Sequence, residues 1–163
     1  SLAGLIDESG VDRDRISGAG IAAPGPIDPL GGTLVDPPHL HGWHRVPLRD
    51  SLAERVGLPT ILDKDVTAAA IAEIWTGGAV AHPGSFVFLY LGTGVGAGLV
   101  IDDEIIEGSL DNAGEIGHIV VDPAGPECWC GNRGCVAVTC TPEAMVREAA
   151  SLIGGPVPGE AWD

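Results

Sequence analysis

The chain has 163 residues, 45% of them hydrophobic, which is enough for one domain with a buried core. Eight basic residues against 23 acidic ones give a formal net charge of −15 at pH 7, which opposes binding to nucleic acid and to anionic membrane surfaces. No apolar stretch is long enough to span a bilayer and no basic region precedes an apolar run at the start, so we expect a cytoplasmic protein.

The first elements alternate apolar runs with turn residues. Residues 1–6 follow an apolar pattern that resembles the end of a helix, from which we expect the chain to be a fragment. Residues 17–23 predict a buried strand that enters a fixed turn at Pro24, Gly25 and Pro26. Residues 46–56 place apolar side chains four apart, which predicts a short amphipathic helix that stops at Gly57.

The following elements predict strands and helices in turn. A brief strand is expected at residues 59–62, and the alanine-rich segment 65–76 predicts a helix that ends at the Gly77 and Gly78 pair. Another short strand is expected at residues 119–121, and Thr141 is expected to cap a last helix that runs to about Ile153. This alternation predicts an α/β fold with a mixed sheet.

Two apolar runs, residues 85–91 and 95–101, are joined by a Gly-Thr-Gly turn, which predicts a β-hairpin. A Rossmann motif needs a helix after its glycines, and a Walker loop needs a Gly-Lys pair, so neither motif fits. Exposed amides and a threonine hydroxyl suit the phosphates of a nucleotide, and the alternative is a plain tight turn. The candidate phosphate-binding residues are Gly92, Thr93, Gly94 and Gly96.

A histidine followed by three closely spaced cysteines predicts a zinc site. The four ligands are His118, Cys128, Cys130 and Cys135. Zinc takes four such ligands in a tetrahedron, and Gly131 and Gly134 let the loop turn between them. Because protein atoms fill every position, the metal is structural; the alternatives are a metal-free reduced cluster and a disulfide. Cys140 is interpreted as a small buried hydrophobe and not as a ligand.

Two carboxylates are candidates for deprotonating or binding hydroxyl groups. Asp65 follows Lys64 at a strand-to-helix junction, where it is either a general base or the N-cap of the helix. Glu115 precedes His118 by three residues and is either a ligand of sugar hydroxyls or an ordinary surface carboxylate. Zinc on one ring nitrogen of His118 would orient the other nitrogen toward a polar ligand.

These motifs, in this order, resemble the ROK family of repressors, uncharacterised proteins and sugar kinases. The resemblance covers about residues 16–151 and is carried by residues 20–26, 38–48, Asp65, the glycine hairpin, residues 114–118 and the cysteine run. It implies an α/β fold of the actin-like, ribonuclease-H-like class, present as a fragment. Residues 1–163 would be the central part of the sugar-binding domain, with a zinc loop at 118–135. The N-terminal phosphate-motif region and the C-terminal adenosine region are absent.

The resemblance also assigns roles to residues. It implies that Asp65 is the catalytic base in a kinase and that the glycine hairpin faces nucleotide phosphates. The implied sugar-binding residues are Gly25, Lys64, Asp65, Glu115 and His118. Two positions depart from the family's kinases, which usually have Asn where this chain has Lys64 and Glu where it has Ala137.

These departures favour a fragment of a sugar-responsive transcriptional regulator over an ATP-dependent sugar kinase of the glucokinase type. A third hypothesis is a zinc-stabilised interaction module with neither activity. We expect structural Zn²⁺, with ATP and Mg²⁺ only if the full-length protein is a kinase. The expected partners are a small sugar or sugar derivative and further copies of the chain in a homo-oligomer. DNA would bind only through an upstream domain.

Overall fold

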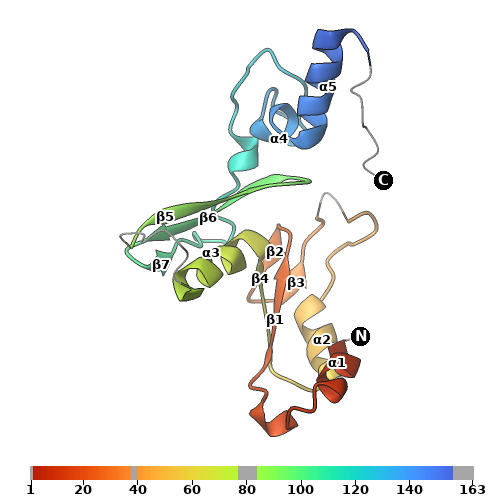
Figure 1. The fold of residues 1–163 in the computed structure, drawn as a ribbon, viewed down its shortest axis with the longest axis vertical. Helices are drawn as coiled ribbons and strands as arrows, with labels where there is room; N and C mark the ends of the chain where they lie inside the picture. Colours follow the sequence, from red (N-terminus) through yellow and green to blue (C-terminus); the bar gives the residue numbers. More distant parts are fainter. Residues whose placement is uncertain (1, 38–39, 77–83, 156–163) are drawn as a thin grey trace. The chain divides into compact units, whose positions relative to one another are not determined.

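A computed structural model describes residues 2–37, 40–76 and 84–155. The chain divides into two compact units, one made of residues 1–88 and 98–113 and the other of residues 89–97 and 114–163. Figure 1 shows the helices and strands of both units. No helix in the described segments is long and apolar enough to cross a membrane.

The first unit contains most of the regular structure. Its elements are the helix α1 (Leu2–Glu8), a 3-10 turn at Arg13–Arg15, the strands β1 (Ala19–Ala23), β2 (Ile27–Asp28) and β3 (Thr33–Leu34), the helix α2 (Leu48–Val56), the strand β4 (Thr60–Lys64), the helix α3 (Asp65–Thr76) and the strand β7 (Glu104–Ile105). Helix α2 ends because Gly57 takes a left-handed conformation with φ of 65°, which glycine adopts without strain.

Strands β1 and β4 pair in parallel, from Ala19 opposite Thr60 to Ala23 opposite Lys64. Strands β2 and β3 form a separate antiparallel pair. The small core beside these strands contains Ala23, Ile27, Leu34 and Leu62. Because β1 and β4 run in the same direction, the segments that follow them leave from the same edge of the sheet.

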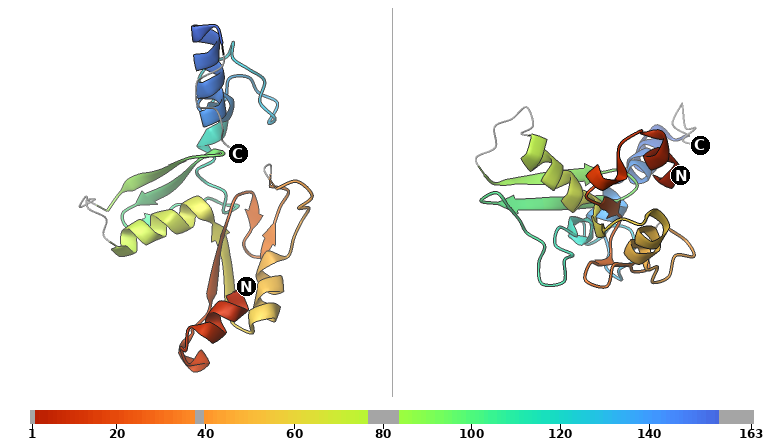
Figure 2. Two further views of the ribbon diagram at one scale, coloured as in Figure 1. Left: turned by 45° about the vertical axis from the view of Figure 1, so that its right-hand side comes forward. Right: turned by 90° about the horizontal axis from the view of Figure 1, so that it is seen from below.

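Helix α3 packs on the sheet of strands β5 (Phe86–Leu91), β6 (Val95–Ile101) and β7, and Figure 2 shows this packing from two further directions. Gly98 makes the close approach possible, because a β-carbon there would lie 2.7 Å from the β-carbon of Ala70. The buried residues Val66 and Ala70 are on the helix side of this contact. The alanine-rich sequence of α3 thus gives a helix that lies close to its sheet.

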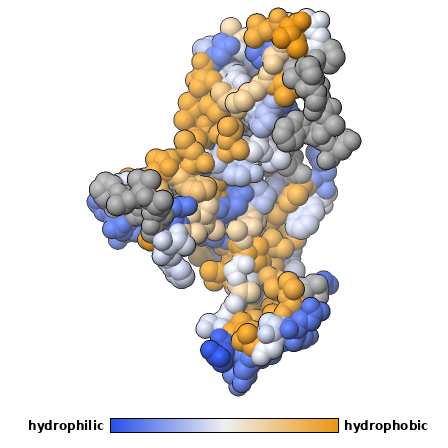
Figure 3. Space-filling model, viewed as in Figure 1, coloured by the Kyte–Doolittle hydropathy of each residue, from blue (hydrophilic) through white to orange (hydrophobic). Residues whose placement is uncertain are grey.

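The second unit contains the turn of the β5–β6 hairpin, a 3-10 helix at Ile116–His118, the helix α4 (Val136–Thr139) and the helix α5 (Pro142–Ile153). The hydroxyl of Thr141 caps α5 by accepting a hydrogen bond from the Ala144 amide. Leu152 and Ile153, near the end of α5, are 78% and 61% exposed. Apolar surface is visible over α5 in Figure 3.

Most of the expected elements are confirmed, including the helix at 65–76 with its exact bounds, the hairpin strands and the cap at Thr141. The strand expected at residues 119–121 is wrong, because only Val120 pairs, in a single bridge with Cys135. The single mixed sheet is also wrong, since the parallel and antiparallel pairs lie in separate sheets. The helix stop expected at Gly77 and Gly78 lies outside the described residues.

Candidate functional site

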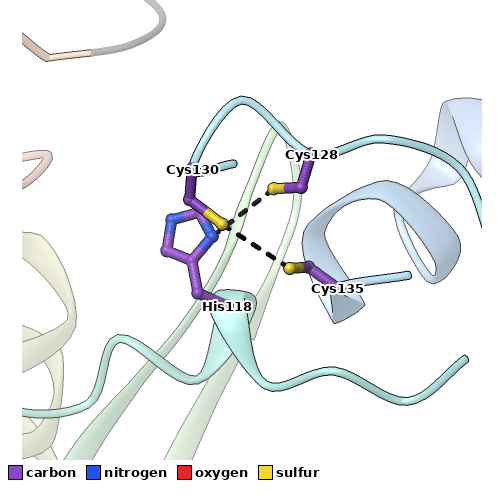
Figure 4. Close-up of side chains that lie close together, drawn as sticks. All are labelled: His118, Cys128, Cys130 and Cys135. Atoms are coloured by element: carbon purple, nitrogen blue, oxygen red, sulfur yellow. Dashed lines mark hydrogen bonds between the residues drawn. The ribbon is translucent and has the colours of Figure 1, made fainter. Parts of the chain in front are cut away.

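The structure brings together the predicted metal ligands His118, Cys128, Cys130 and Cys135 (Figure 4). Their ligand atoms all lie within 4.8 Å of one another. The Cys128 sulfur is 3.6 Å from Nδ1 of His118, and the Cys130 and Cys135 sulfurs are 3.7 Å apart. Two thiolates at about 2.3 Å from a tetrahedral zinc are roughly 3.8 Å apart, so the cluster fits a metal ion of this kind. All four cysteines are free, which removes the disulfide alternative.

Regular elements and a tight loop position the four ligands. His118 ends the 3-10 helix at 116–118, and Cys135 immediately precedes α4. The amide of Cys128 donates to the Asn132 carbonyl at 2.8 Å, which closes the turn that carries the other two ligands. Gly134 has φ of 65°, and a β-carbon there would overlap the carbonyl oxygen of Asp122. Only glycine therefore fits between Cys130 and Cys135 at this point.

The protonation of the thiols differs across the cluster. Burial and the neighbouring thiols Cys130 and Cys128 raise the pKa of Cys135 to about 12. A hydrogen bond from the Asn132 backbone lowers the pKa of Cys130, which is exposed. A cation bound at the cluster has to displace the Cys135 proton, so metal binding releases protons.

Trp129 packs against the cluster and was not predicted as part of the site. Its ring meets the His118 ring edge to face, with centroids 5.4 Å apart and an interplanar angle of 81°. The indole remains 56% exposed. The signal in the sequence was an aromatic residue between two cysteine ligands, where its side chain has to lie beside the metal site.

A second group of predicted residues lies at the carboxyl edge of the β1–β4 pair. Ala23 and Lys64 are opposite each other in the last register position. The turn with Gly25 follows the first strand, and Asp65 opens α3 directly after the second. Ligands of parallel α/β folds bind outside the carboxyl ends of such strands. Asp65 is the first residue of α3, and one of its carboxylate oxygens accepts the amide of the next residue, Val66, at 2.8 Å.

Lys64 is almost fully buried, with 2% exposure, and its Nζ donates to the Ala113 carbonyl at 3.1 Å. Asn112, in the same loop, makes two hydrogen bonds to the Ile27 backbone. Its Oδ1 accepts from the Ile27 N–H at 3.4 Å, and its Nδ2 donates to the Ile27 carbonyl at 3.3 Å. Sequence reasoning missed Asn112, because no pattern shows that it bonds a strand 85 residues earlier.

Burial raises the pKa of Asp63, and the nearby Asp111 carboxylate adds to this effect.

The predicted phosphate hairpin and Glu115 lie in the second unit. The Gly92 amide donates to the Gly94 carbonyl at 3.0 Å, which closes a tight turn. Glu115 is exposed at the start of the 3-10 helix that ends in His118. Gly114, just before it, has φ of 84° and lies against the Ala97 backbone, whose amide donates to the Gly114 carbonyl at 2.9 Å.

The structure therefore gathers the candidate residues into groups. The first unit holds Gly25, Lys64 and Asp65. The second unit holds Gly92, Thr93, Gly94, Gly96, Glu115 and the metal ligands. Ala137, where the resemblance implies a glutamate in kinases, is 7% exposed in α4, two residues after Cys135.

A family model described as "ROK family" matches residues 1–158. The chain belongs to the ROK family. It is 38% identical over 136 residues to a glucokinase of Thermotoga maritima, a match that covers 83% of the chain and 43% of the relative. It is 35% identical over 147 residues to a putative xylose repressor of Caldicellulosiruptor, with 89% of the chain and 36% of the relative covered. The chain thus spans less than half the length of these ROK relatives.

Solved ROK structures show the same fold. A ROK glucokinase from Streptomyces griseus in complex with glucose and AMPPNP matches with a TM-score of 0.74 and 31% identity, over 94% of the chain and 50% of that structure. A ROK transcriptional regulator, described as a homologue of the E. coli MLC protein, matches with a TM-score of 0.77 and 28% identity, over 98% and 40%. The fold is α/β, of the actin-like class found in ROK sugar kinases.

Proposed function

We propose that this chain is the central part of the sugar-binding domain of a carbohydrate-responsive transcriptional regulator. The proposed sugar-binding residues are Gly25, Asp65, Glu115 and His118. In this proposal the full-length protein is cytoplasmic and homo-oligomeric, and its DNA-binding domain lies upstream of residue 1. The putative xylose repressor and the MLC-like regulator among the relatives support this assignment.

The observation that carries the proposal is the position of Lys64. In ROK kinases an asparagine at this place offers a carboxamide, whereas here the side chain ends in an ammonium that donates to the Ala113 carbonyl. A kinase has to hold the attacked hydroxyl in line with the phosphate, whereas a sensor needs only different affinities in two conformations. Replacing a sugar contact by a structural bond is therefore compatible with sensing and unfavourable for catalysis.

Ala137 supports the same assignment. Its methyl group cannot replace the two oxygen acceptors of a glutamate, so one contact to a sugar hydroxyl is lost. Loss of a hydrogen-bond partner costs about 1 to 3 kcal/mol, which corresponds to roughly a fivefold to hundredfold weaker interaction.

We propose that the metal of the cluster is zinc and that it is structural. Three cysteine sulfurs and a histidine nitrogen are the ligand set that zinc prefers over magnesium or calcium, and they leave no open position. When bound, the ion supplies rigidity and no reactive water. His118 joins the metal to the sugar-binding residues, because its second ring nitrogen remains available for a ligand.

An ATP-dependent sugar kinase is the second candidate. It is favoured by the glucokinase of T. maritima, at 38% identity, and by the glycine hairpin. In a kinase Gly92, Thr93, Gly94 and Gly96 would hold nucleotide phosphates, Mg²⁺ would accompany them, and Asp65 would take the proton of the attacked hydroxyl.

The two candidates differ in what the full-length protein does with ATP and DNA. Calorimetry with a panel of hexoses, pentoses and N-acetylhexosamines should identify a sugar that binds, and this sugar should change the binding of operator DNA. A coupled ADP assay with the same sugars should show no turnover in the usual kinase range. Turnover on the order of 1 to 100 per second would replace the regulator by the kinase.

A further inference from the structure

The glycine hairpin contains a side chain that the functions above do not use. Tyr90, the single tyrosine of the 163 residues, lies near the end of β5, two residues before Gly92. A β-carbon on Gly92 would lie 2.7 Å from Cζ of Tyr90 and closer still to its hydroxyl oxygen. The phenol therefore lies across the Gly92 backbone, in space that only glycine leaves open.

Several hydrogen-bond donors of this turn have no protein acceptor. Across the described residues, the Tyr90 hydroxyl, the Thr93 hydroxyl and the amides of Thr93 and Gly94 donate to no protein atom. The Gly92 amide is different, since it closes the turn on the Gly94 carbonyl. Tyr90 is 41% exposed, so the residue is not enclosed by the protein.

The charge around the hairpin also suits an anion. The chain has a net charge of −15, yet residues 85–101 include no acidic or basic side chain. A phosphate on this turn meets no carboxylate from the strands that carry it. Backbone amides and hydroxyl groups bind phosphate through hydrogen bonds alone, without a positive side chain.

We propose that the Tyr90 hydroxyl donates a hydrogen bond to a phosphate group held at the Gly92–Gly94 turn, which makes Tyr90 a binding residue of this site. The inference rests on the proposed phosphate role of the hairpin. The terminal phosphates of a nucleotide and of a sugar phosphate share the chemistry that the turn recognises. Gly92 then has two roles, because it forms the turn and makes room for the phenol.

The test is calorimetry on the full-length protein with three probes, MgATP, glucose 6-phosphate and inorganic phosphate, at fixed ionic strength. Tyr90→Phe removes one oxygen and keeps the ring, so the melting temperature should stay unchanged. Its affinity for the phosphate probe that binds should fall about threefold to tenfold, the range for one lost hydrogen bond. Leu89→Val, on the neighbouring residue, should leave this affinity unchanged. The probe that binds identifies the source of the phosphate.

Two results would overturn the inference. Unchanged or tighter phosphate binding by Tyr90→Phe would show that the hydroxyl is not a donor. Failure of all three probes to bind the unmodified protein would reject the hairpin as a phosphate site, and Tyr90 with it. The sugar-binding proposal is tested separately by the neutral sugars, so its failure is distinguishable from either result.

Discussion

The Nζ atom of Lys64 donates a hydrogen bond to the carbonyl oxygen of Ala113, 49 residues further along the chain. Lys64 ends strand β4, and Ala113 ends the loop that leads to Glu115. A buried ammonium is costly unless hydrogen bonds compensate it, and the Ala113 carbonyl is one acceptor for this one. This bond therefore connects the end of β4, directly before Asp65, to the loop that ends at Ala113.

Replacing Lys64 by methionine should destabilise the protein. Methionine fills a similar volume but leaves the Ala113 carbonyl without this donor, at a cost of about 1 to 3 kcal/mol in the free energy of unfolding. Urea denaturation should show this loss, and Arg55→Met, at an exposed position of α2, should show almost none. Equal stability of the two variants would mean that the bond contributes nothing.

Cys135→Ser should remove the metal, whereas Cys140→Ser should not. Cys135 is one of the four clustered ligands, and Cys140 is outside the cluster. Elemental analysis of protein purified without chelators should find one zinc per chain for the unmodified protein and for Cys140→Ser. Well under one equivalent in the unmodified protein would contradict the zinc assignment, and loss of zinc from Cys140→Ser would contradict the ligand set.

Glu115→Gln should weaken sugar binding if this carboxylate accepts hydrogen bonds from two hydroxyl groups. An amide keeps one acceptor and turns the other into a donor, so we expect the dissociation constant to rise about fivefold to hundredfold. Calorimetry with the sugar that binds should show the change, and Glu54→Gln on the exposed surface of α2 serves as the control. An unchanged affinity would make Glu115 an ordinary surface carboxylate.

Asp63→Asn should stabilise the protein at neutral pH. Burial raises the pKa of Asp63 above its ordinary value of 3.8, so the folded state binds this proton more tightly than the unfolded state. The penalty for ionising Asp63 is therefore absent below the unfolded pKa, and it is fully present above the folded pKa. Asparagine keeps the oxygen that accepts the Lys64 amide at 2.7 Å. Melting temperatures at pH 4 and pH 7 should show a gain at pH 7 that shrinks at pH 4, and the reverse trend would refute this reasoning.

Local patterns were sufficient to predict the elements with strong signals. The alanine-rich run predicted α3, Gly57 predicted the end of α2, and the spacing of His118 and the cysteines predicted the cluster of four candidate metal ligands. Each of these depends on residues close in the sequence or on ligand chemistry with few alternatives. The apolar residues 119–121 were misread as a strand because β-branched side chains favour strands, whereas strand formation needs a partner along the whole segment.

Contacts across the chain were not predictable in this way. The bonds of Asn112 to Ile27 and of Lys64 to Ala113 join segments 85 and 49 residues apart, and no local pattern indicates either. The contact of Trp129 with His118 was not predictable from a local pattern either, although the two residues are close in the sequence. The position of Trp129 between two cysteines was visible, but the edge contact with the His118 ring depends on how the loop folds.

The alternation of strand β4 also protects the alignment of the β1–β4 pair. Leu62 and Lys64 are buried, whereas Ile61 is 71% exposed and Asp63 is only partly covered. A slip of one residue would reverse this order and direct Asp63 toward the inside in place of Lys64. A carboxylate would then face the Ala113 carbonyl, and two acceptors repel each other where a donor and an acceptor now bond. The order of Asp63 and Lys64 along the strand thus penalises misaligned pairing during folding.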